Sequence, residues 1–391
     1  MNFNILKDFV NSLTDWIIPG NSVVVYKDNE KVFEYSSGYA DIENKIKMDA
    51  DKHLFIYSCS KVATVVAALQ LIEAGKMSLD DPLYKFLPEY KNMTIRTGKG
   101  PIHCTKDITI WNLFTMTAGF SYTRSAPWYQ KALELTNGKM DTLSVFKCHA
   151  EEPLYFEPSS NWSYSLCHDV LAGVIEVVSG MKFSEYVIKN VFLPLGMTKT
   201  VFKMNDQIKN NMAQQYVYDV DEEDIVKLQT GGNPLEQNGV VRNFGLGNTL
   251  VFGDDYESGG AGVITTVNDY AKLAMALANY GVGMTGERIL KKETVELLKT
   301  NQLNQKLLDV FSKGRLAGYG YGLGVRTMLD VEASGFCGAV GEFGWGGAAG
   351  ASIFIDCEQK VGLFYAHHML NPQEDYYQPR LRDALYKSLN S

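Results

Sequence analysis

The sequence predicts an α/β (α+β) fold, in which an antiparallel sheet is flanked by helices and carries an inserted, mostly helical lobe. Three observations support this class. The chain begins with a helical pattern followed by short β-type runs, its middle shows helical periodicity, and its last quarter returns to strands and a helix. Strands at both ends of a chain are expected to build one sheet around the helices between them. We therefore expect a single domain over 1–391, with a sheet lobe at about 1–57 and 285–391 and a helical lobe at about 58–284.

The N-terminal segment predicts a helix and a hairpin. Apolar residues recur at helical spacing over residues 2–17, and Pro19 ends that pattern. Strands are expected at 22–26 and 31–36, because two short β-type runs joined by a polar turn are typical of a β-hairpin. Residues 41–52 are polar and predict a loop.

The middle of the chain predicts buried helices. Residues 62–74 are apolar except for Thr64, Gln70 and Glu73, and a helix that is apolar nearly all round is a buried one. Gly75 is expected to end this helix. Further helices are expected at 110–116, 169–179 and 268–279.

Residues 204–258 are polar and rich in glycine, and they predict an irregular segment that folds over a binding site. The acidic run 219–224 within this segment predicts a solvated loop. The C-terminal quarter predicts one strand, a hairpin and a closing helix. The strand is 319–328, the hairpin strands are 351–356 and 361–367, and the helix is 373–389.

Composition limits the classes of partner. The net charge is −8, which argues against nucleic acid as the main partner. No apolar run reaches the ~18 residues of a membrane span, and residues 1–8 lack the basic start of a signal peptide. Six scattered cysteines without C-x-x-C spacing fit free thiols in a cytoplasm, and the histidines show no metal-ligand spacing. We expect a cytoplasmic protein with no membrane segment and no metal.

Ser58-x-x-Lys61 is the most informative short motif. A serine three residues before a lysine at a helix start lets both side chains share one face, so an amine can activate a hydroxyl without histidine. The same spacing occurs at Ser144 to Lys147 and at Ser179 to Lys182, but only Ser58 opens a long apolar run. In the alternative reading, Ser58 caps the helix and Lys61 points to solvent.

An activated serine needs a further group, because a free lysine titrates near ~10.4 and is a poor base at neutral pH. Tyr164, just before the helix expected at 169–179, is the candidate for relaying protons to and from Ser58. The alternative is a buried aromatic residue with its hydroxyl satisfied. Cys59 is a rival nucleophile, but no histidine motif accompanies it.

A glycine-rich run, 341–350, precedes the strand expected at 351–356. Glycine lets a substrate approach the backbone closely, so an N–H group there could pair with that of Ser58 to hold an oxyanion. The alternative is a glycine-rich turn with Trp345 packed in the core.

These three elements together resemble class C β-lactamases and their relatives, the family VIII carboxylesterases. Ser58-x-x-Lys61 matches the first family motif, Tyr164-Ser165-Leu166 stands at the second, and Trp345-Gly346-Gly347 stands at the third. The resemblance covers about residues 20–370 and implies a β-lactamase/transpeptidase-like fold. Connecting segments that are also similar lie at 79–89, 108–119, 193–197 and 258–262.

Two departures from the family pattern bear on the substrate. Leu166 stands where β-lactamases carry Asn, and Trp345 stands where they carry Lys. Losing a charge-assisted contact costs about 1.5–3 kcal/mol, so these departures disfavour a β-lactam, and they resemble the esterase branch. An apolar pocket is expected near Trp345. Its other aromatic residues would be Tyr122, Trp128, Tyr155 and Phe156.

The resemblance implies a serine hydrolase that cleaves a small ester through an acyl-enzyme, without metal or cofactor. Ser58 would attack, Lys61 and Tyr164 would act as the base system, and the N–H groups of Ser58 and Ala348 would form the oxyanion hole. Gly346 and Gly347 would bind the substrate beside them. A β-lactamase or a D-amino-acid peptidase or amidase is an alternative, and a non-catalytic scaffold is another. An α/β-hydrolase is excluded, because no G-x-S-x-G elbow occurs.

Overall fold

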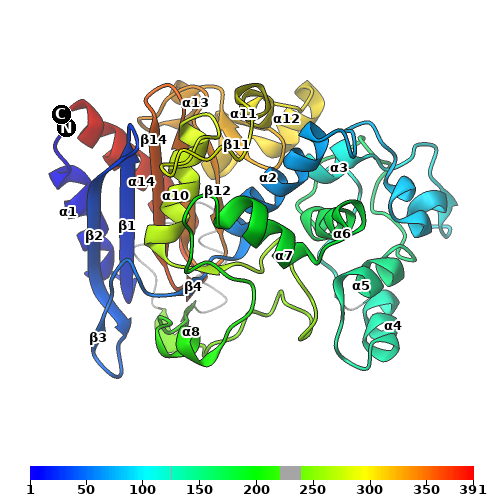
Figure 1. Ribbon diagram of the computed structural model, residues 1–391, viewed down its shortest axis with the longest axis horizontal. Helices are drawn as coiled ribbons and strands as arrows, with labels where there is room; N and C mark the ends of the chain where they lie inside the picture. The colour runs from blue at the N-terminus through cyan, green and yellow to red at the C-terminus, as the bar shows by residue number, and fades with distance from the viewer. Residues whose placement is uncertain (125, 221–238) are drawn as a thin grey trace.

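An eight-stranded antiparallel sheet forms one side of the molecule in the computed structural model, which describes residues 1–391 except 125 and 221–238 (Figure 1). The strand order is β10-β11-β12-β13-β14-β1-β2-β3. The fold class expected from the sequence is therefore confirmed. The strands are β1 (Gly20–Lys27), β2 (Glu30–Asp41), β3 (Ile46–Lys47), β10 (Tyr319–Tyr321), β11 (Arg326–Met328), β12 (Phe343–Gly347), β13 (Ala351–Asp356) and β14 (Val361–His367).

The two ends of the chain meet in this sheet, as the order of elements predicts. β1 pairs with β14, with Val24 opposite Phe364. Helices α1 (Asn4–Thr14) and α14 (Glu374–Asn390) pack together on one face. Val23 and Val25 point into this layer, and Val24 points to the opposite face, as alternation along a strand requires.

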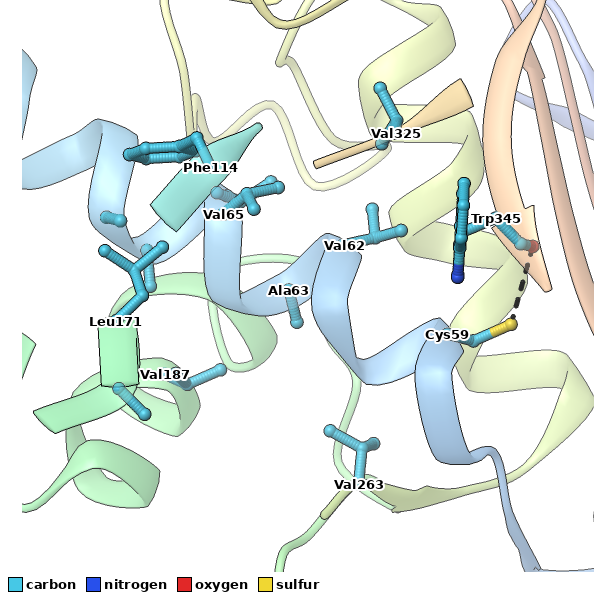
Figure 2. Packing of buried hydrophobic residues seen from close by; sticks show 14 of the residues in the cluster. Cys59, Val62, Ala63, Val65, Phe114, Leu171, Val187, Val263, Val325 and Trp345 are labelled. Carbon is cyan, nitrogen blue, oxygen red and sulfur yellow. Dashed lines mark hydrogen bonds between the residues drawn. The ribbon is translucent and has the colours of Figure 1, made fainter. Parts of the chain in front are cut away.

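Helix α2 (Ser60–Glu73) joins the sheet to the helical part of the molecule. Figure 2 shows that its side chains Val62 and Val65 lie between Leu171 and Phe114 of the helical part and Trp345 of the sheet. This position explains why the helix is apolar on all sides. The helices of this part are α3 (Ile110–Phe114), α4 (Pro127–Leu135), α5 (Thr142–His149), α6 (Cys167–Ser179) and α7 (Phe183–Val187), of which α6 and α7 contact α2.

Helix α10 (Val267–Ala278) packs against β14 and β1. Gly362 makes this close packing possible, because a Cβ atom there would lie 2.5 Å from the backbone nitrogen of Met275. The proposed division into a sheet lobe and a helical lobe stays a prediction. No helix in the described part of the chain is both long and apolar enough to cross a membrane.

Smaller elements complete the described chain. The helices and helical turns are η1 (Tyr57–Cys59), η2 (Leu83–Lys85), η3 (Pro88–Asn92), η4 (Ile188–Phe192), α8 (Asp206–Asn210), α11 (Lys292–Lys299), α12 (Gln305–Phe311), η6 (Gly314–Leu316) and α13 (Val331–Ser334). The short strands are β4 (Leu54–Phe55), β5 (Thr94–Ile95), β6 (Ile102–His103), β7 (Tyr216–Asp219), β8 (Val240–Asn243), β9 (Ile264–Thr265) and β15 (Met369–Leu370).

Three expectations about the chain need correction. The strand expected at 319–328 is a hairpin of β10 and β11, because Gly324 adopts a positive φ of 85° and the N–H of Gly322 donates to the carbonyl of Val325 across the turn. The segment 204–258 contains α8, β7 and β8 instead of being irregular throughout. Residues 221–224 of its acidic run lie outside the described residues.

The loop expected at 41–52 also differs from the structure. β2 continues to Asp41, and β3 follows within this range. The end of β2 is polar, with the Ser36 and Ser22 hydroxyls 2.8 Å apart across the strand pair. This part of the strand therefore lacks the apolar alternation that would have predicted it.

We predict that Gly362→Ala destabilises the protein by about 1–3 kcal/mol, because the added methyl group must displace α10 from the sheet. The midpoint of urea unfolding measures this effect. Gly98→Ala is the matched control, since a Cβ atom at Gly98 meets nothing within 4 Å. Equal midpoints for the two variants would contradict this account of the packing of α10.

Candidate active site

Ser58 lies in the short turn η1, directly before α2. Tyr57, the preceding residue, has a left-handed φ of 44°, which is costly for a residue with a bulky side chain. Its hydroxyl donates to Oε1 of Gln215 at 2.7 Å, and this bond helps to hold the turn. The side chain of Ser58 lines a cavity of about 360 Å³, so it is placed at the start of the helix and open to a small ligand.

Lys61 is fully buried one turn further along α2. Its Nζ lies 3.3 Å from Oγ of Ser58, 3.1 Å from Oη of Tyr122 and 2.8 Å from the carbonyl oxygen of Gly260. An ammonium group has three donors, and each of these acceptors can take one of them. The alternative in which Lys61 points to solvent is therefore wrong.

Two tyrosines contact Lys61 in different ways. Nζ of Lys61 donates to the hydroxyl of Tyr122 and lies 4.8 Å from the ring centroid of Tyr164. The Tyr164 hydroxyl instead accepts from Nε1 of Trp345 at 3.1 Å. Burial, together with the neighbouring Tyr164, raises the pKa of Tyr122 well above its usual range. From the sequence, Tyr122 was expected only in a pocket wall, and its contact with Lys61 was missed.

Asp169 is a second group near Lys61 that no sequence motif indicated. Its buried carboxylate accepts from the Ser258 hydroxyl at 2.5 Å, the Tyr256 hydroxyl at 3.1 Å and the N–H of Gly260 at 3.2 Å. Burial raises the pKa of Asp169, and the positive charge of Lys61 opposes that rise. Asp169 thus holds the turn whose carbonyl group accepts from Lys61. The glycine-rich segment 258–262 is the sequence feature that could have indicated this contact.

Gly260 has to be glycine at this point. A Cβ atom there would lie 2.2 Å from Oδ2 of Asp169 and 3.2 Å from Nζ of Lys61. A side chain would therefore separate the carboxylate from the turn that it holds.

The motif Trp345-Gly346-Gly347 lies beside Ser58, because β12 ends at Gly347. A Cβ atom at Gly347 would lie 2.2 Å from the carbonyl oxygen of Ile56, so only glycine lets β12 come this close to the segment before Ser58. Cys59 donates through Sγ to the Trp345 carbonyl at 3.6 Å (Figure 2). The ring of Trp345 stacks on that of Tyr164 at 5.5 Å and belongs both to the core and to the cavity wall.

The cavity brings most of the expected site residues together. Ala348, which is exposed directly after β12, also lines it. The full lining is Ser58, Trp162, Tyr164, Arg315, Leu316, Arg326, Trp345, Gly346, Gly347, Ala348, Glu374 and Gln378.

The expected aromatic pocket is wrong for Tyr122, Trp128, Tyr155 and Phe156, which are not among the described lining residues. Trp128 packs against His149, with ring centroids 5.1 Å apart, and the hydroxyl of Tyr155 lies 3.0 Å from that of Thr123. Trp162 and Leu316 supply the apolar wall instead.

The rival groups do not have the geometry of a nucleophile or a metal site. Lys147 and Lys182, in the two other Ser-x-x-Lys copies, are exposed. Cys59 is fully buried, and burial raises the pKa of its thiol far above the usual range. Among the residues that the structure describes, no group of three His, Cys, Asp or Glu side chains could hold a metal ion.

Known proteins share sequence and fold with this chain. A family model described as Beta-lactamase matches residues 9–387. Esterase EstB of Burkholderia gladioli is 27% identical over 390 residues, covering 97% of this chain and 93% of that protein. A putative D-alanyl-D-alanine carboxypeptidase of Escherichia coli K12 is 26% identical, covering 76% of this chain and 70% of that protein.

A solved structure described as "EstCE1, a hydrolase with promiscuous acyltransferase activity" superimposes on this chain with a TM-score of 0.77. The superposition covers 98% of this chain and 97% of that one, at 24% sequence identity. This likeness shows the fold.

We predict that Cys59 in the native protein resists alkylation by iodoacetamide at about pH 8, because the reaction needs a thiolate and access to it. The exposed Cys337 reacts under the same conditions and serves as the control. Mass spectrometry of tryptic peptides measures both sites. Modification of Cys59 as fast as of Cys337 would restore it as a rival nucleophile.

Proposed function

This chain belongs to the Beta-lactamase family, and from that premise we propose that it is a serine hydrolase that cleaves small carboxylic esters through an acyl-enzyme on Ser58. One observation carries the proposal. Nζ of the buried Lys61 lies 3.3 Å from the Ser58 hydroxyl at the edge of a cavity of substrate size. An amine at this distance is the activating group that a serine nucleophile needs in the absence of histidine.

In the proposed reaction, Lys61 takes part as the neutral amine. Oγ of Ser58 bonds to the ester carbonyl carbon, its proton passes to Nζ of Lys61, and Lys61 restores the proton that Tyr164 later gives to the leaving group. The N–H groups of Ser58 and Ala348 stabilise the oxyanion. The bond to the alcohol oxygen then breaks, and the alkoxide leaves with a proton from Tyr164. Water attacks the acyl-enzyme, which releases the acid and returns the proton to Ser58. No step requires a metal or a cofactor.

The two tyrosines take different roles in this proposal. Tyr164 lines the cavity, so in this proposal its hydroxyl serves a leaving alcohol. Tyr122 contacts Nζ of Lys61 and is not among the described lining residues. We therefore assign proton exchange with the leaving group to Tyr164, and we assign the positioning of Lys61 to Tyr122.

An ester is favoured over an amide or a β-lactam by two side chains. Leu166 is buried at the start of α6 and offers no amide to a substrate, and Trp345 offers no cation. The likeness to EstB supports the same preference. The likeness to a putative carboxypeptidase keeps a D-amino-acid peptidase or amidase as the alternative. Comparing the turnover of an ester, a D-Ala-D-Ala peptide and a cephalosporin distinguishes these candidates.

We also propose a cytoplasmic location, since all six cysteines are free thiols and free thiols persist in a reducing compartment. The proposed partner is a small-molecule ester or amide.

We predict that Ser58→Ala abolishes the hydrolysis of 4-nitrophenyl esters, because the nucleophile is lost. A fluorophosphonate should label the wild-type protein at Ser58, as mass spectrometry of the modified peptide would reveal. Full hydrolysis by the variant would refute the assignment. A wild-type protein that neither hydrolyses esters nor takes the label would instead support the alternative of a non-catalytic scaffold.

We predict that Tyr164→Phe lowers kcat by about 10²–10⁴-fold for an ethyl ester and by less for a 4-nitrophenyl ester, because nitrophenolate leaves without a proton. Tyr122→Phe should lower kcat to the same extent for both esters, because it acts through Lys61. Tyr155→Phe is the control, as this tyrosine is exposed and away from the cavity. Equal losses for both esters in Tyr164→Phe would remove its role toward the leaving group.

A further inference from the structure

The strand β4, which leads to Ser58, has two hydrogen-bonding edges. On one edge β4 pairs with β9, and the N–H of Ile56 donates to the Val263 carbonyl at 3.3 Å. N–H groups alternate between the two edges along a strand, so the N–H of Phe55 points to the opposite edge. The acceptor that it meets there is Nε2 of His368, at 3.2 Å.

A second chain segment runs beside that opposite edge. The N–H of His53 donates to the Asn211 carbonyl at 3.1 Å, and the N–H of Ala213 donates to the His53 carbonyl at 3.0 Å, which is the pattern of a parallel ladder. The next bond of such a ladder would join the N–H of Phe55 to the Ala213 carbonyl. Nδ1 of His368 lies 2.9 Å from that carbonyl oxygen instead. The imidazole therefore stands in place of one ladder bond and contacts both groups that the bond would join.

These two partners fix the state of the His368 ring. The N–H of Phe55 can only donate, so Nε2 carries no proton, and the Ala213 carbonyl can only accept, so Nδ1 carries one. His368 is 2% exposed, and burial lowers its pKa to about 4. The ring is therefore neutral at pH 7 and holds the two segments one ring width apart.

The backbone that carries this ring also contacts the segment after β12. The N–H of the residue that follows His368 donates to the Ala349 carbonyl at 3.1 Å. Ala349 directly follows Ala348, one proposed donor of the oxyanion hole, and Phe55 lies three residues before Ser58, the other donor. Phe55 and Ala349 also belong to one buried apolar cluster. The segment around His368 thus contacts both parts of the chain that carry the proposed donor N–H groups.

We propose that His368 is a positioning residue of the oxyanion hole, and that its imidazole sets the place of the Ser58 N–H group relative to the Ala348 N–H group. This inference rests on the proposed ester hydrolysis. An oxyanion hole stabilises the transition state only when both donors point to one oxygen atom, and a displacement of about 1 Å costs up to ~10²-fold in rate. Binding of the unreacted substrate depends much less on this alignment.

Two ketones separate the oxyanion hole from the rest of the cavity. 1,1,1-Trifluoro-4-phenylbutan-2-one adds to a serine hydroxyl and forms an oxyanion, whereas 4-phenylbutan-2-one binds as the unreacted ketone. The variant His368→Phe keeps a ring but loses both hydrogen bonds. In this variant we expect kcat/KM for 4-nitrophenyl butyrate and the affinity for the trifluoromethyl ketone to fall about 10-fold or more. The affinity for the methyl ketone should change by less than about 2-fold.

Two further variants show whether the hydrogen bonds carry this effect. The amide of His368→Gln offers one donor and one acceptor in place of the two ring nitrogens, so its kcat/KM should exceed that of His368→Phe by about 5-fold or more. His149→Phe is the matched control, because it removes another buried imidazole, from α5, and His149 is not among the described residues of the cavity wall. The control should keep kcat/KM within about 2-fold of the wild type. The melting temperature reports whether each variant is folded.

The unmutated protein provides a test that does not depend on the folding of a variant. The ¹⁵N chemical shifts of the His368 ring at pH 7, assigned through the backbone resonances, should show a neutral ring with its proton on Nδ1. A proton on Nε2, or a charged ring, overturns the inference.

The outcomes separate this inference from the proposed function. An unchanged kcat/KM in His368→Phe, an equal loss of affinity for both ketones, or a loss in His368→Gln as large as in His368→Phe overturns the inference and leaves the esterase intact. A wild-type protein without Ser58-dependent hydrolysis overturns both.

Discussion

The positive charge of Lys61, held entirely inside the protein, is the constraint around which this structure is arranged. A buried ammonium is tolerated only when its donors are satisfied and opposite charge lies close by. Ser58, Tyr122 and the carbonyl of Gly260 take its donors, and Asp169 supplies the compensating charge. These partners come from η1, from the segment after α3, from α6 and from the turn before β9. The charge therefore adds to the packing that joins these segments, and it does so beside the nucleophile.

Two glycines, Gly260 and Gly347, are required for the geometry of the site. At Gly260 and Gly347 a single methyl group would collide with the atoms that make the site, an Asp169 carboxylate oxygen in one case and the Ile56 carbonyl in the other. The motifs Ser-Gly-Gly-Ala-Gly and Trp-Gly-Gly are thus steric requirements for bringing three chain segments to one point. Their value lies in close approach of backbone to neighbouring atoms and not in flexibility.

The sequence predicted those features that depend on local pattern. The helix after Ser58, the helix α6 and the hairpin β13–β14 follow from apolar spacing and turn residues, and the structure contains them with ends shifted by a few residues. The three motifs placed Ser58, Tyr164 and Trp345 in one site, and these residues line one cavity.

The contacts that sequence reasoning missed are long-range. Lys61 and Gly260 are 199 residues apart, and Asp169 and Ser258 are 89 residues apart. No local pattern encodes that Tyr122, among 22 tyrosines, reaches the lysine. The position of Arg326 in the cavity wall was missed for a different reason. The range 319–328 was interpreted as one strand, whereas the turn at Gly324 sets where β11 begins.

The pairing of β1 with β14 has a consequence for the synthesis of the protein. The β1–β2 hairpin leaves the ribosome first, but the strand that covers its inner edge is among the last segments to be made. Closing so large a loop is entropically costly and slow, which gives the fold a high contact order. Until β14 emerges, the apolar valines of β1 form an open strand edge that can pair with another chain. This edge has no strand partner until β14 has been synthesised.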